Sequence, residues 1–277
     1  MWLVLIVWPR CAPAVAQRAS LLIMPTVRIA CLLRAAAVFV VLASAHATAQ
    51  PQPRLELEVE GGSLWIARND VQIPNETGTR FSLADLIEPG PSPLVRVDLT
   101  WNIAERHAVR AVYAPLVVER SGTPDRSLLF AGTLFAPGVA TDATYQFNSY
   151  RFTYRYRIAH GDRWTWHIGA TAFVRDARVA LRQGDVAAED TDVGGVPLAH
   201  LRAEARLTDR WSLVFDLDGS AAPQGRAIDF GGRLRYAVND RLALGVGYRT
   251  IEGGADVDQV YNFAWINAVT GSLVVRF

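Results

Sequence analysis

Apolar and polar side chains alternate with a period of two along most of the chain after residue 50. In a β-strand, successive side chains point to opposite faces, so this period predicts strands with one apolar and one polar face. The pattern therefore predicts an all-β fold. One such stretch has apolar Tyr150, Phe152, Tyr154, Tyr156 and Ile158 interleaved with Arg151, Thr153, Arg155 and Arg157.

Two kinds of connection join the alternating stretches, and they predict an up-and-down antiparallel order. Four are short, with Gly-Asp at 161–162 and Asn-Asp at 239–240 providing hairpin turn chemistry. We expect ten strands, with eight or twelve as the neighbouring even counts. The short turns are at 104–106, 160–162, 208–210 and 239–241, and the longer connections are at 69–93, 121–141, 184–195, 219–225 and 253–258. The expected strands are 54–68, 94–103, 107–118, 144–159, 163–183, 196–207, 211–219, 226–237, 241–252 and 259–277.

Alternation alone does not separate a soluble β-sandwich from a transmembrane barrel, because both have one apolar face. The placement of the aromatic residues favours the barrel. Trp101, Trp164, Trp166, Trp211 and Tyr236 all lie next to the short turns, and amphipathic rings at one level are typical of a membrane interface. Short turns at one end and long loops at the other are the layout of membrane barrels. We predict that these four tryptophans point outward.

The first fifty residues have the composition of an export signal. Arg28 and Arg34 precede an apolar stretch, and Ala47-Thr48-Ala49 has the small residues of a cleavage site. We expect residues 1–49 to be a signal peptide region, cleaved near Ala49, with Met24 as an alternative start. Residues 50–277 would then form the barrel domain. No run of eighteen apolar residues follows Gln50, so no transmembrane helix is expected there.

The mature chain predicted in this way is nearly neutral and contains no cysteine. Both cysteines, Cys11 and Cys31, lie in residues 1–49, as do four of the 28 basic residues, all of which are Arg. The rest of the chain contains 24 Arg and 27 Asp and Glu, which gives a net charge of −3. This balance gives no reason to expect a nucleic-acid partner, a metal site or another cofactor.

The last strand resembles that of bacterial outer-membrane β-barrel proteins, in which a final amphipathic strand ends in an aromatic residue recognised by the barrel-assembly machinery. Here Tyr261, Phe263, Trp265, Val269, Leu273, Val275 and Phe277 share one face. With the signal peptide, the resemblance covers almost the whole chain. It implies a location in the outer membrane of a Gram-negative-type bacterium, with outer-membrane lipid and lipopolysaccharide as neighbours and a monomeric state. The resemblance says nothing about activity.

Among small barrels of that class, the expected strand count is closest to the omptin proteases. Their paired Asp-Asp and Asp-His residues have no match in this sequence. Asp216 and Asp218 have the spacing of an acidic pair, but they lie away from the long loops. The protease activity is therefore not carried over.

The polar faces carry enough opposite charges to fill a narrow lumen with ion pairs. We expect Arg276 to pair with Glu56, Glu58 or Glu60, and Asp98, Glu204 and Asp229 to pair with Arg110, Arg206 and Arg233, respectively. A salt-bridged plug is the preferred interpretation; an anion-selective lining and a lipid-phosphate site are the alternatives. The predicted network comprises Glu56, Glu58, Glu60, Arg96, Asp98, Arg110, Arg151, Arg155, Arg157, Arg202, Glu204, Arg206, Asp229, Arg233, Arg235 and Arg276.

A catalytic site has only weak candidates. His200 is expected just below the loop at 184–195, Ser149 at a similar height two strands away, and Asp192 in that loop. Such a set would resemble barrel enzymes that modify lipid A, because a hydroxyl nucleophile needs an imidazole base. The alternative is a hydrogen-bonded lumen histidine.

The leading hypothesis is a non-enzymatic structural or surface-interaction protein, with a lipid A-modifying or omptin-like enzyme and a narrow channel as the alternatives. Two local features are also predicted. Residues 175–178 interrupt the alternation and indicate a β-bulge, and residues 81–86 indicate one helical turn inside the first long loop.

Overall fold

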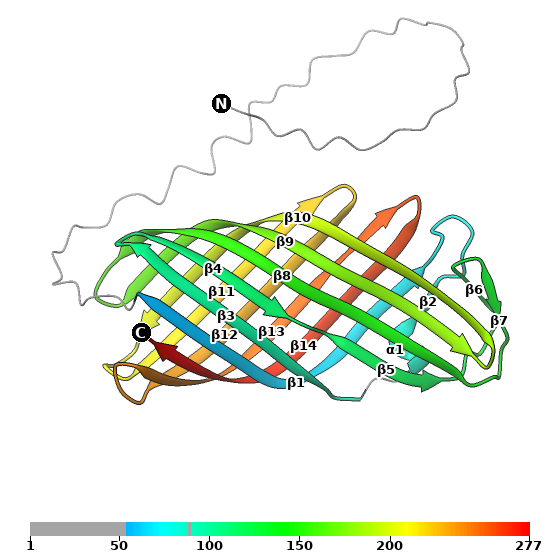
Figure 1. Ribbon diagram of the computed structural model, residues 1–277, viewed down its shortest axis with the longest axis horizontal. Coiled ribbons are helices and arrows are strands. Elements are labelled where there is room, and N and C mark those ends of the chain that lie inside the picture. The colour runs from blue at the N-terminus through cyan, green and yellow to red at the C-terminus, as the bar shows by residue number, and fades with distance from the viewer. Residues whose placement is uncertain (1–53, 88–89) are drawn as a thin grey trace, which may run out of the picture. The chain divides into compact units, whose positions relative to one another are not determined.

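The computed structural model describes residues 54–87 and 90–277, and these residues form a β-barrel (Figure 1). The predicted signal peptide lies outside the described residues. The elements of the barrel, in chain order, are β1 (Leu55–Gln72), β2 (Phe81–Ser82), α1 (Leu83–Ile87), β3 (Ser92–Ala104), β4 (His107–Ala114), β5 (Val117–Gly122), β6 (Leu128–Phe130), β7 (Thr133–Phe135), β8 (Thr141–His160), β9 (Trp164–Gln183), β10 (Val186–Arg206), β11 (Trp211–Ala222), β12 (Gly225–Ala237), β13 (Leu242–Val257) and β14 (Val260–Arg276).

Ten antiparallel strands close the barrel, as the sequence predicts. Each wall strand pairs with its neighbours in chain order, β5 continues the position of β4 beside β8, and β2 adds two residues to β1. The first and last strands complete the circle, from Glu56 opposite Arg276 to Gln72 opposite Tyr261. Closure leaves no free sheet edge along that seam, which satisfies the backbone groups that lipid cannot.

The short turns lie at one end of the barrel and are held by side-chain caps. The Thr208 hydroxyl accepts hydrogen bonds from the backbone amides of Arg210 and Trp211, at 3.2 and 3.0 Å. The Asn239 carbonyl oxygen accepts bonds from the amides of Arg241 and Leu242, both at 2.9 Å. Local side-chain acceptors of this kind favour tight turns.

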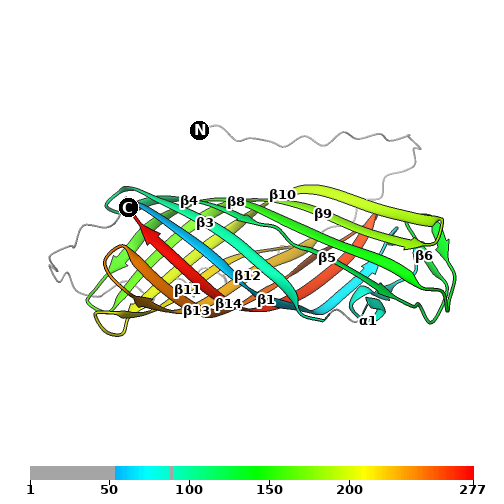
Figure 2. The ribbon, with the colours of Figure 1, turned by 60° about the horizontal axis from the view of Figure 1, so that its bottom comes forward.

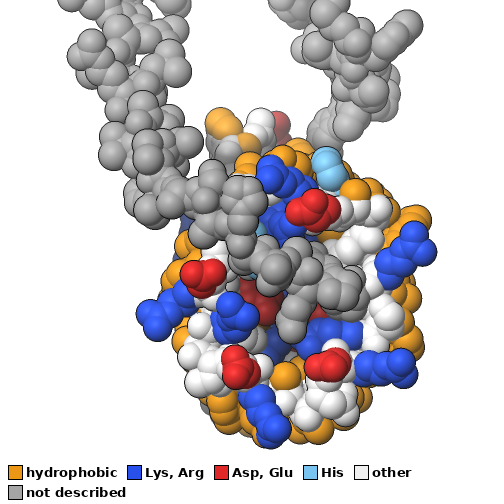
Figure 3. All heavy atoms as spheres, turned by 90° about the vertical axis from the view of Figure 1, so that its left-hand side faces the viewer, with side chains coloured by type: hydrophobic (Ala, Val, Ile, Leu, Met, Phe, Trp, Pro, Cys, Tyr) orange, Lys and Arg blue, Asp and Glu red, His pale blue; other side chains and the backbone are white. Residues whose placement is uncertain are grey.

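The outer wall carries two levels of aromatic residues with an apolar band between them. Trp101, Trp164 and Trp211 are exposed beside the short turns, and Trp166 stacks on Trp164, so the outward orientation predicted for these tryptophans is confirmed. Figure 3 shows hydrophobic side chains around the circumference of the short-turn end, with charged side chains at its rim.

The upper aromatic level is formed by Trp65 and Trp265, both exposed on the outer wall. The lower level is that of Trp101, Trp164 and Trp211 beside the short turns. Trp101 is paired with Leu55, and Trp65 follows Leu55 by ten residues on β1, so about ten residues separate the two levels. At a rise of about 3.3 Å per residue and a strand tilt of about 40°, they span roughly 25 Å, the height of the apolar band of a membrane barrel.

The interior of the barrel has two layers. In the half nearer the short turns, charged side chains point inward and are buried. In the other half, an apolar layer fills the barrel, formed by wall residues such as Leu64, Leu116 and Ile266 and by the folded-in loop elements β2, α1, β6 and β7. Figure 2 shows α1 and β6 at the end opposite the C-terminus.

Three of the five long connections are much shorter than predicted. The segment 184–195 belongs almost entirely to strands, because β9 ends at Gln183 and β10 begins at Val186. Likewise, β11 and β12 are separated by residues 223–224, and β13 and β14 by residues 258–259. These hairpins continue beyond the upper aromatic level, where outward side chains no longer need to be apolar, so the alternation disappears while the strand continues.

The predicted β-bulge at 175–178 is wrong for the same reason. Pairing of this segment with β8 and β10 is continuous. Asp176 accepts hydrogen bonds from Gln146 and Asn148 on the adjacent strand. The helical turn predicted at 81–86 is present as α1, shifted by a residue or two. Among the described residues, no helix is long and apolar enough to cross a membrane.

Replacing Val246 by arginine tests the lipid-facing band. Val246 is 58 % exposed on β13, where it pairs with Leu234 and Gly271 between the two aromatic levels. An arginine facing the middle of a bilayer costs roughly 2–4 kcal/mol, and the cost falls towards the interfaces. We expect V246R to lower the free energy of unfolding in lipid vesicles by about 2 kcal/mol or more.

Val193→Arg is the matched control, since Val193 is also strongly exposed but lies on the extension of β10 beyond the upper aromatic level. Its unfolding free energy should stay close to that of the wild type. Equal losses in the two variants would contradict the placement of the band.

Candidate functional site: the charged lumen and the outer-face groove

The charged lumen is organised around carboxylates that each meet more than one arginine. Glu60 lies 3.0 Å from Arg249 and 3.4 Å from Arg233. Asp229 lies 2.7 Å from Arg151 and 3.3 Å from Arg96 and is also paired with Arg249. All of these side chains are nearly fully buried, so each charge depends on its partners for compensation.

A second group of pairs surrounds Asp216. Arg202 donates to both oxygens of this carboxylate, at 3.0 and 3.1 Å, and Arg233 donates to it from the neighbouring strand. Both Arg202 bonds come from the same guanidinium nitrogen, and hydrogen bonds between charged groups are stronger than those between neutral groups. Arg233 also lies near Glu60, so it links this group to the first.

Pairs with fewer partners complete the network towards the short turns. Arg110 is paired with Asp98, and Arg276 donates to Glu56 at 3.1 Å; both pairs were expected from the sequence. Arg235 is paired with Glu58 and lies 3.5 Å from Glu56. The network therefore runs around the barrel, from β1 through β3 and β4 to β14.

Two of the expected pairs are wrong. Asp229 pairs with Arg249, Arg151 and Arg96 instead of Arg233, because the inward side chains reach across the lumen and are not limited to adjacent strands. Glu204 lies 3.4 Å from Arg202, while Arg206 is exposed at the rim and donates to the backbone carbonyl of Asp162.

Two other predicted members make few charged contacts. Arg157 is 3.0 Å from Glu105, an exposed residue in the first short turn. Arg155 donates to the Thr100 hydroxyl at 2.9 Å. Within the described part of the chain, Arg155 has no salt bridge to a carboxylate.

The sequence-based network omitted three central residues: Arg249, Asp216 and Asp218. Asp218 accepts a hydrogen bond from Arg151 at 2.9 Å. Arg249 follows outward Leu244, Val246 and Tyr248, so the same alternation places it inward. Glycines at intervening inward positions made that stretch of β13 inconspicuous.

The catalytic candidates are not brought together. His200 is buried in the middle of the lumen, and its Nδ1 lies 2.8 Å from Asp218. Ser149 is paired in register with Arg175, and Asp192 forms a salt bridge with Arg175. The expected position of His200 below a loop is incorrect because segment 184–195 is a strand. Among the described residues, no hydroxyl lies within hydrogen-bonding distance of its Nε2.

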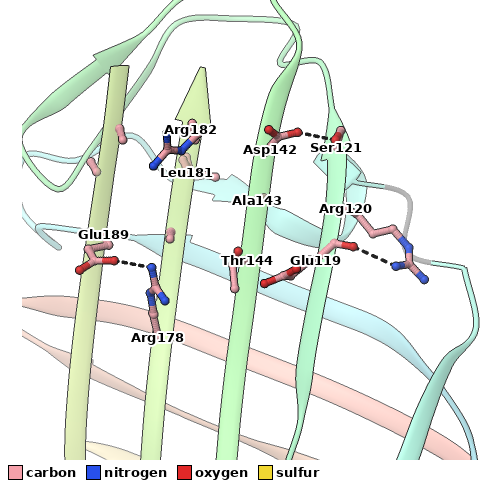
Figure 4. A pocket seen from close by; sticks show the side chains of 13 residues that line it. Glu119, Arg120, Ser121, Asp142, Ala143, Thr144, Arg178, Leu181, Arg182 and Glu189 are labelled. Atoms are coloured by element: carbon pink, nitrogen blue, oxygen red, sulfur yellow. Dashed lines mark hydrogen bonds and ion pairs between the residues drawn. The ribbon is translucent and has the colours of Figure 1, made fainter. Parts of the chain in front are cut away.

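A groove on the outer face lies above the upper aromatic level, where β5, β8, β9 and β10 run side by side (Figure 4). Its volume is about 640 Å³. Arg178 and Glu189 form a 2.6 Å salt bridge across it, and Ser121 is bonded to Asp142. Arg182 also lines the groove and has no hydrogen bond or ion pair to any described residue.

No metal site is apparent in residues 54–87 and 90–277: no three His, Cys, Asp or Glu side chains are grouped to hold an ion. The lumen carboxylates are each engaged by arginines.

Comparison with known proteins gives a likeness in architecture. The outer membrane protease OmpT from Escherichia coli aligns over 80 % of this chain and 96 % of its own, with a TM-score of 0.52 at 10 % identity. The chain has the fold of an outer-membrane β-barrel. An outer membrane channel from Pseudomonas putida F1 aligns over 85 % of this chain and 100 % of its own, with a TM-score of 0.41 and 10 % identity. No family model and no curated protein matches this barrel.

Replacing Arg249 by methionine tests the role of ion pairing in this outer-membrane fold. The change keeps most of the side-chain volume but leaves Glu60 and Asp229 with fewer partners. Removing one member of a buried ion pair costs roughly 3–5 kcal/mol. We expect R249M to lower the unfolding free energy, measured by urea titration in lipid vesicles, by an amount in this range.

Arg226→Met provides the comparison, because Arg226 forms an exposed fork with Glu252 on the outer side of the same strand pair, at 2.6–2.9 Å. An exposed pair contributes less than about 1 kcal/mol. If R249M were no more destabilising than R226M, the lumen charges would not depend on one another.

Proposed function

We propose that the protein is a non-enzymatic barrel of the bacterial outer membrane whose lumen is closed by its own ion pairs, and that it acts through its surface. The observation that carries this proposal is the network of buried arginines and carboxylates across the lumen. Its central side chains, including Arg110, Arg235 and Arg249, are at most 2 % exposed.

The charged layer leaves little space for permeating ions. A guanidinium from one wall strand reaches a carboxylate on a strand across the lumen, as in the pairing of Arg151 on β8 with Asp229 on β12. An ion entering such a section would have to displace partners that neutralise each other. The apolar layer above adds a second obstacle, since Phe130 and Phe135 are completely buried there.

The geometry gives less support to an enzymatic role. His200 and Asp218 make the base-orienting contact of a catalytic triad, but His200 is buried and, among the described residues, no hydroxyl lies within hydrogen-bond reach of its Nε2. Nucleophilic catalysis needs a nucleophile within hydrogen-bond reach of the base. The hydrogen-bonded lumen histidine is therefore the favoured interpretation.

The outer-face groove is the proposed interaction surface, with lipopolysaccharide and other outer-membrane lipids as the proposed partners. It lies just beyond the lipid-facing band, at the level where headgroup sugars and phosphates surround a barrel. Arg182 leaves a free guanidinium there, suited to bidentate contact with phosphate. We propose that the barrel is monomeric and is inserted by the barrel-assembly machinery.

Conductance in planar bilayers tests the closed lumen. We expect the purified wild-type protein to give negligible currents, because the charged layer blocks the lumen. A variant with Phe130→Ala and Phe135→Ala loosens the apolar layer alone and should also give negligible currents. Large, stable, anion-selective currents from the wild type would overturn the closed lumen and favour the channel.

Retention of lipopolysaccharide tests the groove. We expect Arg182→Gln to lower the amount of lipopolysaccharide that co-purifies with the folded barrel, because the free guanidinium is lost. Arg210→Gln removes a charge at the opposite, short-turn end, where Arg210 donates to Tyr236, and should retain the wild-type amount. Equal retention in both variants would remove the groove from the proposed interaction.

A further inference from the structure

In the described residues, the hydrogen-bonded ladder of the wall is interrupted at the outer end of β3. β3 pairs with β4 only from Val97, opposite Tyr113, towards the short turn. Beyond that point β5 pairs with β8 alone, so residues 92–96 of β3 have a ladder partner only on the β1 side. Figure 1 shows β5 following β8 while β3 runs beside β1.

Prolines lie on both sides of this interruption. Pro93 is within β3, and Pro115 separates β4 from β5. Proline has no amide proton to donate and is confined in sheets to edges and breaks. The sequence itself therefore prevents these two segments from forming a regular ladder.

The outer end of the interruption is closed. Arg120 of β5 donates to the Ser92 hydroxyl of β3 at 3.4 Å. The helix α1 packs behind β5, so closely that a side chain at Gly122 would collide with the backbone carbonyl of Leu86. The opening is therefore bounded above by this contact and below by the first β3–β4 pair.

A crevice occupies the opening and joins the two sides of the wall. Its lining includes Val95, which is 48 % exposed on the outer face, and Pro115. It also includes Leu94, Leu116 and Phe147 of the barrel interior. The crevice therefore has lining residues from both faces of the wall at the point where the ladder is missing.

The crevice lies within the lipid-facing band, just below the upper aromatic level. Ser92 pairs with Leu64, the residue before Trp65 of that level, and Val95 pairs with Gly61 below it. Val95 at the opening and Leu99, which lies below it on the paired part of β3, are exposed and apolar. In a membrane, the surroundings at this depth are acyl chains.

From these observations we propose that the crevice is a lateral binding site for the end of one acyl chain of an outer-leaflet lipid. The cavity volume is about 20 Å³, which admits the end of a slender chain and excludes a sugar or an aromatic ring. An inserted chain would cover the apolar rim left by the missing ladder. The buried side chains of Arg96, Arg249 and Ser149 form its floor, and their polarity ends the apolar path. This inference rests on the proposed membrane location but not on the closed lumen.

Photolabelling in vesicles tests this site, with a phospholipid that carries a diazirine along its acyl chain. Labelled peptides of the folded wild-type protein should carry the label on Leu99, which reports membrane insertion, and also on inward-facing Leu116 and Phe147. Val214, fully buried behind the paired strands β10, β11 and β12, should remain unlabelled. Labelling of Leu99 without Phe147, or of Val214 as strongly as Phe147, would overturn the site. Absence of label on Leu99 would overturn the proposed membrane location and the site that rests on it.

Two variants change the crevice in opposite directions. Ala114→Val adds two methyl groups that fill the crevice and should abolish the labelling of Phe147, whereas Leu116→Ala widens it and should increase that labelling. Ala111→Val is the matched control, because Ala111 is exposed on the outer face of the same strand, and it should label as the wild type does. Heat-modifiable migration on a gel confirms folding of each variant. If A114V fails to fold, L116A alone decides: unchanged or lower labelling of Phe147 in that variant overturns the proposal.

Discussion

The structure depends on the compensation of the charges inside a lipid-facing barrel, most of them by opposite charges and Arg155 by a hydroxyl acceptor. A charge on the outer band is costly, so the polar side chains of all ten strands converge on a narrow lumen. There the same charges would be destabilising if any were left alone. Glu60 and Asp229 meet this condition by accepting from several arginines at once, which couples strands that are distant in the chain.

This coupling gives the lumen its two layers. Where the strands carry inward arginines and carboxylates, these side chains form buried ion pairs; where they carry leucine, isoleucine and phenylalanine, the loops fold inward and complete an apolar core. The boundary between the layers lies near Arg96 and Leu94, consecutive inward residues of β3. It is also the level at which the β3–β4 ladder ends. The change from charged to apolar side chains in the lumen therefore coincides with the interruption in the wall.

The sequence predicted the wall where lipid dictates the pattern. Between the aromatic levels, outward positions must be apolar, so strand positions and the inward direction of Arg155, Arg202 and Arg235 could be inferred from alternation. Closure into a barrel was inferred from the aromatic residues beside the short turns. Beyond the upper level that requirement ends, and the strand extensions at 184–195 were expected to be loops. Residue Asp176 illustrates this, because it remains in register on β9 while its outward side chain is polar.

The ion-pair partners of the lumen side chains were less predictable than whether each side chain points inward or outward. Arg276 and Glu56 lie opposite each other on paired strands, so adjacency was sufficient. Asp229 instead meets Arg96 and Arg151 across the lumen, a contact set by the curvature of the closed wall. His200 was misplaced through the same error as the loop above it, and its true partner, Asp218, lies directly opposite on β11.

The layered lumen has a consequence for hydration. Water can approach the charged network from the short-turn end, where Arg157 meets exposed Glu105, but the apolar layer shields the network from the loop end. The interior is thus wetted from one side, and the dielectric constant around the ion pairs falls with distance from the short turns. Amide and guanidinium protons near Glu56 would exchange with solvent sooner than those near Arg249, giving the barrel an axial gradient of exchange that a uniformly packed lumen would lack.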